Sequence, residues 1–129
     1  MNSMILAVAA LALAVSITTG CASLRAQGAP AEYDGGMLVD YSKKMTLYTF
    51  DKDPDNGTKS VCNGPCAANW PPFIAGAADK DVAGFTKVKR DDGTLQWAYK
   101  GKPLYFWVKD QRPGDKTGDG FNNVWRVAK

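Results

Sequence analysis

The 129-residue chain contains no histidine, and this absence excludes several kinds of functional site. A Ser–His–Asp triad, a histidine general base, a haem attached through Cys-x-x-Cys-His and a histidine-rich metal site all need that residue. Long basic clusters are missing as well, since the densest run is Lys87-Val88-Lys89-Arg90. The formal net charge of +3 is therefore no indication of nucleic-acid binding.

Charge is missing altogether from residues 1–20. Met4 to Ile17 is an almost unbroken apolar run, short for a membrane span and typical in length of a signal peptide. The run ends in Thr18-Thr19-Gly20-Cys21, which resembles the lipobox of bacterial lipoproteins. That resemblance implies cleavage before Cys21 and a lipid anchor on it, with palmitate among the acyl chains. Ordinary secretion with cleavage after Ala22, and an uncleaved anchor, are the alternatives.

These signals divide the chain into three parts. Residues 1–20 are interpreted as a lipoprotein signal peptide and residues 21–36, rich in Ala, Gly and Pro, as a flexible tether. Residues 37–129 are interpreted as one small domain. The five phenylalanines, five tyrosines and four tryptophans all lie between Tyr33 and Trp125. Aromatic side chains bury much area per residue, so a domain of this size can form a core.

One short pattern occurs twice in the domain. Residues 47–53 read LYTFDKD and residues 104–110 read LYFWVKD, so the form Tyr-x-[Phe/Trp]-x-x-Asp recurs 57 residues later. The motif residues are Tyr48, Phe50, Asp53, Tyr105, Trp107 and Asp110. Alternation places the tyrosine and the next aromatic on one face of a strand and the leucine on the other. Each aspartate is expected to accept backbone N–H bonds in the following loop rather than to serve in a catalytic pair.

Alternating apolar positions predict a mainly β fold, built from two repeated β-hairpin units spanning about 37–73 and 94–127. The predicted strands are residues 37–42, 45–50, 85–90, 94–99, 103–108 and 124–128. The first two are expected to pair as a hairpin. The turn Asp91-Asp92-Gly93 joins two others, with glycine in the left-handed position. In residues 94–99, Leu95, Trp97 and Tyr99 are assigned to the buried face. Thr94, Gln96 and Ala98 are assigned to the opposite face.

A short helical segment is expected near Cys62–Trp70. Pro65 can occupy a first helical position and Pro71-Pro72 stops a helix after Trp70, which leaves one or two turns over residues 65–69. Lipidation of Cys21 would leave Cys62 and Cys66 as a pair. Four residues apart in a helical turn, their Cα atoms lie about 6 Å apart, within disulfide range.

A structural disulfide is the favoured interpretation of this pair, and a redox-active dithiol or a copper(I) thiolate site are the alternatives. Thioredoxin-like motifs have two intervening residues, whereas Cys62 and Cys66 have three. Residues 51–57 resemble the start of a calcium loop, but the glycine is one place late and Cys62 stands where a glutamate is needed, so no metal is expected. Trp97, Tyr99 and Trp125 either fill the core, which is favoured, or form a ligand-stacking platform.

The doubled motif, SVCNGPCAANWPPF at residues 60–73 and DGTLQWAYKGKPLYFW at residues 92–107 together resemble the bacterial secreted-repeat lipoproteins, described as predicted lipoproteins with a Yx(FWY)xxD motif. The resemblance covers residues 36–127. It implies a lipid-anchored protein on the outer face of the plasma membrane or in the outer membrane. Because the molecular role of that family is not established, it implies no catalytic residue.

We therefore expect a cell-envelope lipoprotein that is a non-enzymatic binding or structural module. The expected partners are the membrane, through the N-terminal lipid, and an envelope protein or a glycan. Neither a cofactor nor a nucleic-acid partner is expected. The alternative function is envelope redox chemistry or copper handling through Cys62 and Cys66.

Overall fold

Short β-strands dominate the computed structural model, which describes residues 28–129. The strands are β1 (Ala31–Asp34), β2 (Met37–Asp40), β3 (Tyr48–Phe50), β4 (Ile74–Ala75), β5 (Phe85–Lys89), β6 (Leu95–Tyr99), β7 (Lys102–Pro103) and β8 (Trp125–Val127). No helix of the described part is long and apolar enough to span a membrane. The predicted signal peptide, Cys21 and the start of the tether lie outside the described residues.

The first two strands form a tight hairpin. Ala31 pairs with Asp40 and Asp34 pairs with Met37. Gly35 and Gly36 make the turn with φ of 58° and 83°, and two positive φ values in a two-residue turn favour glycine. The predicted tether of residues 21–36 is therefore wrong over Ala31–Asp34, because the two glycines are a hairpin turn rather than part of a linker.

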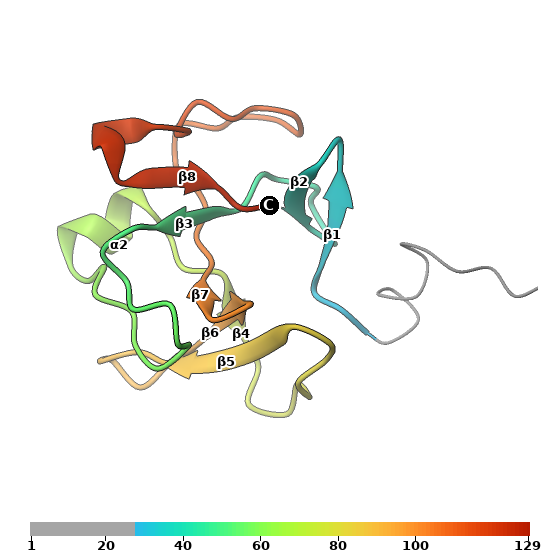
Figure 1. The fold of residues 1–129 in the computed structure, drawn as a ribbon, viewed down its shortest axis with the longest axis vertical. Helices are drawn as coiled ribbons and strands as arrows, with labels where there is room; N and C mark the ends of the chain where they lie inside the picture. Colours follow the sequence, from blue (N-terminus) through green and yellow to red (C-terminus); the bar gives the residue numbers. More distant parts are fainter. Residues whose placement is uncertain (1–27) are drawn as a thin grey trace, which may run out of the picture.

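β3 pairs with β8. The hairpin predicted between residues 37–42 and 45–50 forms only around one β-bridge, with the Asp40 N–H donating to the Met45 carbonyl and the Leu47 N–H to the Leu38 carbonyl, both at 3.0 Å. Tyr48 lies opposite Val127 and Phe50 opposite Trp125, and Figure 1 shows the two strands side by side. The bridge joins Val39 to Thr46. The last strand of the chain thus pairs with the motif strand of the first repeat.

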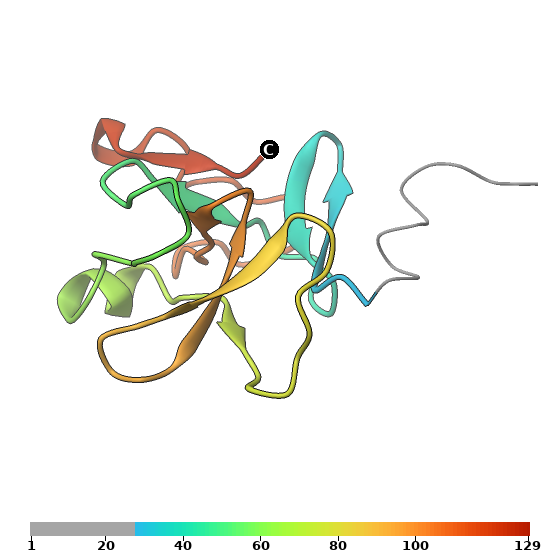
Figure 2. The same ribbon diagram turned by 60° about the horizontal axis from the view of Figure 1, so that its bottom comes forward.

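β6 is the central strand of the third sheet, with β5 on one side and β4 and β7 on the other. Figure 2 shows the β5–β6 hairpin in yellow and orange, apart from the β1–β2 hairpin in blue. Its predicted turn is confirmed, since Gly93 has φ of 87° and donates to the Arg90 carbonyl at 2.9 Å. The face opposite Leu95, Trp97 and Tyr99 was assigned to Thr94, Gln96 and Ala98, and this is wrong for Gln96 and Ala98, which are buried, whereas Thr94 is exposed. Gln96 is fully buried because Arg90 and Leu104 cover it.

The short helix α2 spans Pro65–Asn69, as predicted. Its last turn closes with a bond from the Trp70 N–H to the Cys66 carbonyl at 2.8 Å, and Pro71 follows directly. Two clusters of buried residues fill the interior, one containing Leu47 and the other Tyr48 and Phe50. The two faces of this motif strand thus belong to different clusters, as the alternation predicted.

Candidate functional site

The two motif tyrosines lie directly opposite each other at the centre of the molecule. The Tyr48 N–H donates to the Tyr105 carbonyl at 2.8 Å, and the Tyr105 N–H donates to the Tyr48 carbonyl at 2.9 Å. Their hydroxyls then cross over. Tyr48 donates to Asp110 Oδ2 at 2.5 Å, and Tyr105 donates to Asp53 Oδ2 at 2.5 Å. The tyrosine of each motif therefore bonds the aspartate of the other motif.

Each aspartate also fastens the loop that follows it, as expected. Asp53 Oδ1 accepts the Val61 N–H at 2.7 Å. Asp110 Oδ1 accepts the Thr117 N–H at 3.0 Å and the Thr117 hydroxyl at 2.6 Å. Both carboxylates thus join a tyrosine of the opposite repeat to the loop of their own repeat.

Burial sets the protonation of these groups. Burial and the bond to Asp110 raise the pKa of Tyr48 far above its ordinary value of 10.0. Burial and the bond to Asp53 raise the pKa of Tyr105 in the same way. Burial also raises the pKa of Asp53, against the opposing effect of its bonds from Tyr105 and Val61. Both phenols are consequently permanent donors at physiological pH.

A stack of four aromatic rings lies beside the tyrosines. Phe50 stacks on Trp125 with centroids 4.3 Å apart, Trp125 on Trp70 at 3.8 Å, and Trp70 on Trp107 at 4.0 Å. Members of the first and second repeat alternate along it. A Cβ at Gly118 would lie 2.6 Å from Trp70 Cη2, so this position needs glycine. All four rings are buried, which makes the stack part of the core.

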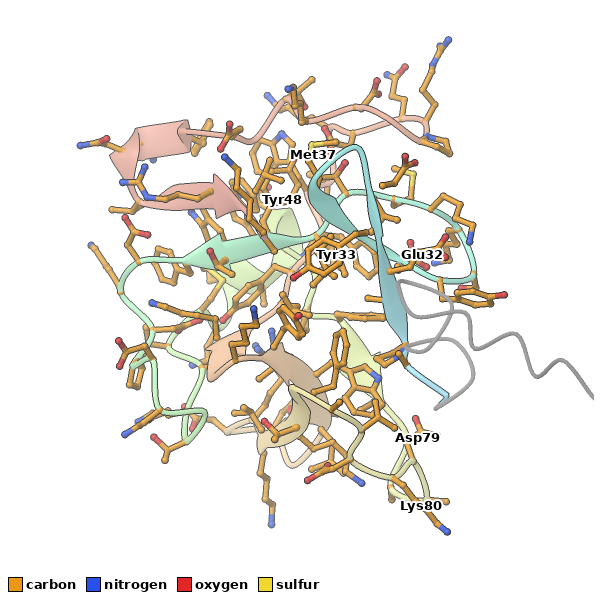
Figure 3. All side chains as sticks on the ribbon, turned by 45° about the vertical axis from the view of Figure 1, so that its right-hand side comes forward. Glu32, Tyr33, Met37, Tyr48, Asp79 and Lys80 are labelled. Atoms are coloured by element: carbon orange, nitrogen blue, oxygen red, sulfur yellow. A yellow bond between two sulfur atoms is a disulfide. The ribbon has the colours of Figure 1, made fainter. Side chains whose placement is uncertain are left out.

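The other two aromatic residues of the predicted stacking platform lie in the cluster that contains Leu47. Trp97 is 4% exposed and Tyr99 is 9% exposed. The Tyr33 hydroxyl donates to the Tyr99 hydroxyl at 2.9 Å, and Figure 3 shows Tyr33 turned from β1 toward the interior. The ring faces of Trp97, Tyr99 and Trp125 are covered, so the structure corresponds to the core interpretation and offers no open platform at these residues.

A buried arginine is linked through Ser60 to the Tyr105–Asp53 pair. Arg90 is 5% exposed and donates to Ser60 Oγ at 2.8 Å, to Gln96 Oε1 at 2.7 Å and to the Cys62 carbonyl at 2.6 Å. Ser60 Oγ lies 2.6 Å from the Tyr105 hydroxyl. In the sequence, this arginine stands out only as the end of the densest basic run, Lys87-Val88-Lys89-Arg90. A signal for its burial was the glutamine in the otherwise apolar strand β6.

The cysteine pair forms a disulfide with an S–S distance of 2.08 Å and Cα atoms 5.2 Å apart. Cys62 is fully buried in the cluster of the aromatic stack, and Cys66 is partly buried against it. Among residues 28–129, no group of three or more His, Cys, Asp or Glu side chains is placed to hold a metal ion. The bridge thus ties the helical insertion of the first repeat to the aromatic core.

An apolar surface around Ile74 is open to solvent, and we refer to it as the Ile74 surface. Ile74 is 52% exposed on β4. It lines two hollows, one on each side. The first is lined by Asp40, Ser42, Lys43, Pro71, Pro72, Phe73, Ile74 and Phe106, and the second by Ile74, Ala75, Ala77, Lys89, Gly93, Thr94 and Leu95. No strand was predicted over Ile74–Ala75, and nothing in the sequence indicated this surface.

Comparison with known proteins gives one result. The family model of a secreted repeat of unknown function matches residues 31–74 and 86–129. These matches confirm the family resemblance and extend each repeat over the strand that the sequence analysis left outside it, β1 in the first and β5 in the second. No curated protein and no solved structure matches the chain. The crossed tyrosine–aspartate pairs form between these two copies. By the two matches, the chain belongs to this family of secreted repeats of unknown function.

Proposed function

We propose that the protein is a lipid-anchored module of the cell envelope that binds another envelope polypeptide. The description of its family as secreted supports a location outside the cytoplasm. The lipobox-like sequence before Cys21 supports the anchor, since acyl chains bind a bilayer by about 0.8 kcal/mol per buried CH₂. Six residues lie between Cys21 and Gly28. At most about 3.6 Å per residue, that segment would keep the domain close to the membrane.

The observation that carries the binding role is the Ile74 surface. Phe73 and Phe106 are partly buried beside Ile74, with centroids 5.4 Å apart and an edge-to-face angle of 74°. The Lys43 ammonium lies 5.6 Å from the centre of the Phe106 ring. An exposed apolar side chain flanked by two hollows offers an anchor position for a side chain of a partner.

The chemistry of this surface favours a polypeptide over a glycan. Sugar binding needs an open aromatic face, whereas Phe73 and Phe106 are packed edge to face. The strand β4 is at the outer side of its sheet, beyond β6. An extended polypeptide can lie along such a strand and place an apolar side chain in either hollow.

A photo-crosslinking amino acid at position 74 tests the binding role in living cells. Position 108 is the matched control, because Val108 is 49% exposed and lies outside the Ile74 surface. We expect a discrete protein adduct from position 74 and none from position 108, identified by mass spectrometry. Equal labelling at both positions, or an adduct with glycan alone, would contradict the proposal.

The anchor has its own test. The mass of the membrane-extracted protein should show a diacylglyceryl group and an additional acyl chain on Cys21, and Cys21→Ser should release the domain from the membrane fraction. An unmodified Cys21 would remove the anchor from the proposal. The alternative function through Cys62 and Cys66 is tested by the reduction potential of the bridge. A value below about −300 mV is typical of structural disulfides, and one near −200 mV is typical of oxidoreductases.

A further inference from the structure

The crossed pairs and the aromatic stack form one continuous group of oxidisable side chains. The indoles of Trp107, Trp70 and Trp125 follow one another at centroid distances of 4.0 and 3.8 Å. Tyr48 contacts Trp70 edge-on at 5.3 Å, and Tyr105 contacts Trp125 edge-on at 5.1 Å. Indole and phenol rings are readily oxidised by one electron, and electrons move rapidly between rings in van der Waals contact.

Each tyrosine of this group has a proton acceptor in place. A phenol that loses an electron becomes a very strong acid, so it must lose its proton at the same time or directly afterwards. The acceptors are Asp53 for Tyr105 and Asp110 for Tyr48, each with its oxygen 2.5 Å from the hydroxyl. Asp53 is 3% exposed and Asp110 is 9% exposed, which leaves these carboxylates as the direct acceptors rather than bulk water.

The tyrosines alone do not require carboxylates at these places, and the second oxygen of each carboxylate serves its loop rather than the phenol. A buried tyrosine hydroxyl is satisfied by a neutral acceptor such as a backbone carbonyl, whereas burying a carboxylate costs several kcal/mol of desolvation. The chain places one against Tyr48 and a second against Tyr105. The pairing is thus the specific feature that a proton-coupled oxidation needs.

We propose that the domain is a one-electron redox relay that accepts oxidising equivalents at Trp107 and holds them on the Tyr105–Asp53 and Tyr48–Asp110 pairs. Its substrates are one-electron oxidants, such as metal complexes or radicals, and one-electron donors that reverse the step. Trp107 is at one end of the stack beneath Phe121, with ring centroids 4.9 Å apart. Phe121 is itself 40% exposed, so an oxidant can come close to this end.

The electrons and protons balance at each step. The oxidant takes one electron from Trp107, and the resulting vacancy passes to Trp70 and Trp125 as each indole gives up one electron in turn. Tyr105 then donates one electron to the Trp125 radical cation, while its O–H bond breaks and the proton forms a bond to Asp53 Oδ2. The products are the reduced oxidant, a neutral tyrosyl radical and a protonated carboxyl. Tyr48 and Asp110 react likewise through Trp70.

Flash photolysis of the full chain in detergent with tris(bipyridine)ruthenium(II) and a sacrificial electron acceptor tests the relay. The ruthenium(III) formed by the flash is the one-electron oxidant. Transient absorption and electron paramagnetic resonance distinguish tryptophanyl from tyrosyl radicals. We expect a tryptophanyl signal that converts into a tyrosyl signal, and the conversion should slow in D₂O because a proton moves with the electron. A conversion rate that D₂O leaves unchanged would overturn the coupling to Asp53 and Asp110.

Variants locate the radical. The double variant Tyr48→Phe/Tyr105→Phe should lose the tyrosyl signal and retain the tryptophanyl one, and Trp107→Phe should lower the yield of both. Tyr41→Phe is the matched control, because Tyr41 belongs to neither buried cluster, and it should leave both signals unchanged. A tyrosyl signal of full size in the double variant, or no tyrosyl signal in the wild type, would overturn the proposal. These outcomes are independent of the lipid anchor and of the Ile74 surface.

Discussion

The two repeats build the same tyrosine–aspartate pair in different surroundings. On one side, Tyr105 and Asp53 adjoin Ser60 and the buried Arg90, next to a loop closed by a disulfide. On the other side, Tyr48 and Asp110 adjoin Thr117 and Gly118, whose N–H approaches the Tyr48 hydroxyl at 3.3 Å.

The loops after the motifs differ in the same way. In the second repeat, Asp115 accepts the N–H groups of Gln111 and Arg112 at 2.8 and 3.2 Å, and Asp119 accepts the Val127 N–H at 3.1 Å. Carboxylates therefore hold this loop, whereas the corresponding loop of the first repeat has a covalent bridge. The shared residues determine how the copies join, and the residues that differ determine how strongly each side is held.

Among the predicted changes, replacing Arg90 should lower the free energy of unfolding most, and it acts on the Tyr105–Asp53 side. Arg90→Met removes the donors to Gln96 and to the Cys62 carbonyl. Because a buried acceptor left without a donor costs about 1–3 kcal/mol, the free energy of unfolding should fall by about 3 kcal/mol or more. Arg126→Met is the matched control, since Arg126 pairs with Asp51 at the surface, and its loss should stay below about 1 kcal/mol. Urea unfolding measures both, and equal losses would contradict a special role for the Tyr105 side.

Alkaline pH should destabilise the Tyr48–Asp110 side and the Tyr105–Asp53 side of the domain together. The unfolded chain releases the tyrosine protons near pH 10.0, whereas folding raises the pKa of Tyr48 and Tyr105 above that value. The folded state then binds more protons, so the free energy of unfolding falls as the pH rises above 10.0. The slope is about 1.4 kcal/mol per pH unit for each of the two residues. Tyr48→Phe and Tyr105→Phe should each remove one such contribution from urea unfolding curves recorded at several pH values, and an unchanged slope would contradict this.

Removing the disulfide should destabilise the loop of the first repeat more than the loop of the second repeat. Cys62→Ala/Cys66→Ala opens the short loop, and chain entropy predicts a loss of about 2 kcal/mol in the free energy of unfolding. Hydrogen exchange should show faster opening around residues 60–70 and little change around residues 111–119. Equal acceleration in both regions would mean that the bridge supports the whole domain rather than the first repeat.

The smallest predicted effect tests the crossing itself. In double-mutant cycles, Tyr48→Phe should couple to Asp110→Asn by about 1 kcal/mol and remain additive with Asp53→Asn within about 0.5 kcal/mol. Tyr105→Phe should show the opposite preference. Coupling between residues of the same motif would mean that each repeat keeps its own pair in solution. The measurement is again urea unfolding of the single and double variants.

Local features of the fold could be predicted from sequence. The helix at Pro65–Asn69 follows from two prolines, and the turn at Gly93 follows from its composition. The two-faced burial of residues 47–50 follows from alternation. Local misses include β4, which no predicted strand covers, and β1, where a glycine pair beside a proline-containing stretch was read as a linker, although it also fits a two-residue hairpin turn.

Partner choices over long distances could not be predicted in this way. Tyr48 bonds an aspartate 62 residues away, and Tyr105 bonds one 52 residues away. The spacing of the motifs indicates that the two copies are equivalent. It does not indicate whether each tyrosine bonds the aspartate of its own motif or that of the other motif. The burial of Arg90 could not be predicted for the same reason, since its acceptors Ser60, Cys62 and Gln96 come from two separate segments of the chain.

The crossed pairs also bear on how the gene can be divided. The loop between β4 and β5 joins the two matched repeats. A chain cut there would leave Tyr48 on one fragment and Asp110 on the other, with Tyr105 and Asp53 divided in the opposite sense. Neither fragment can complete its own interior, yet each supplies what the other lacks. Two separately expressed halves should therefore reconstitute the domain by complementation.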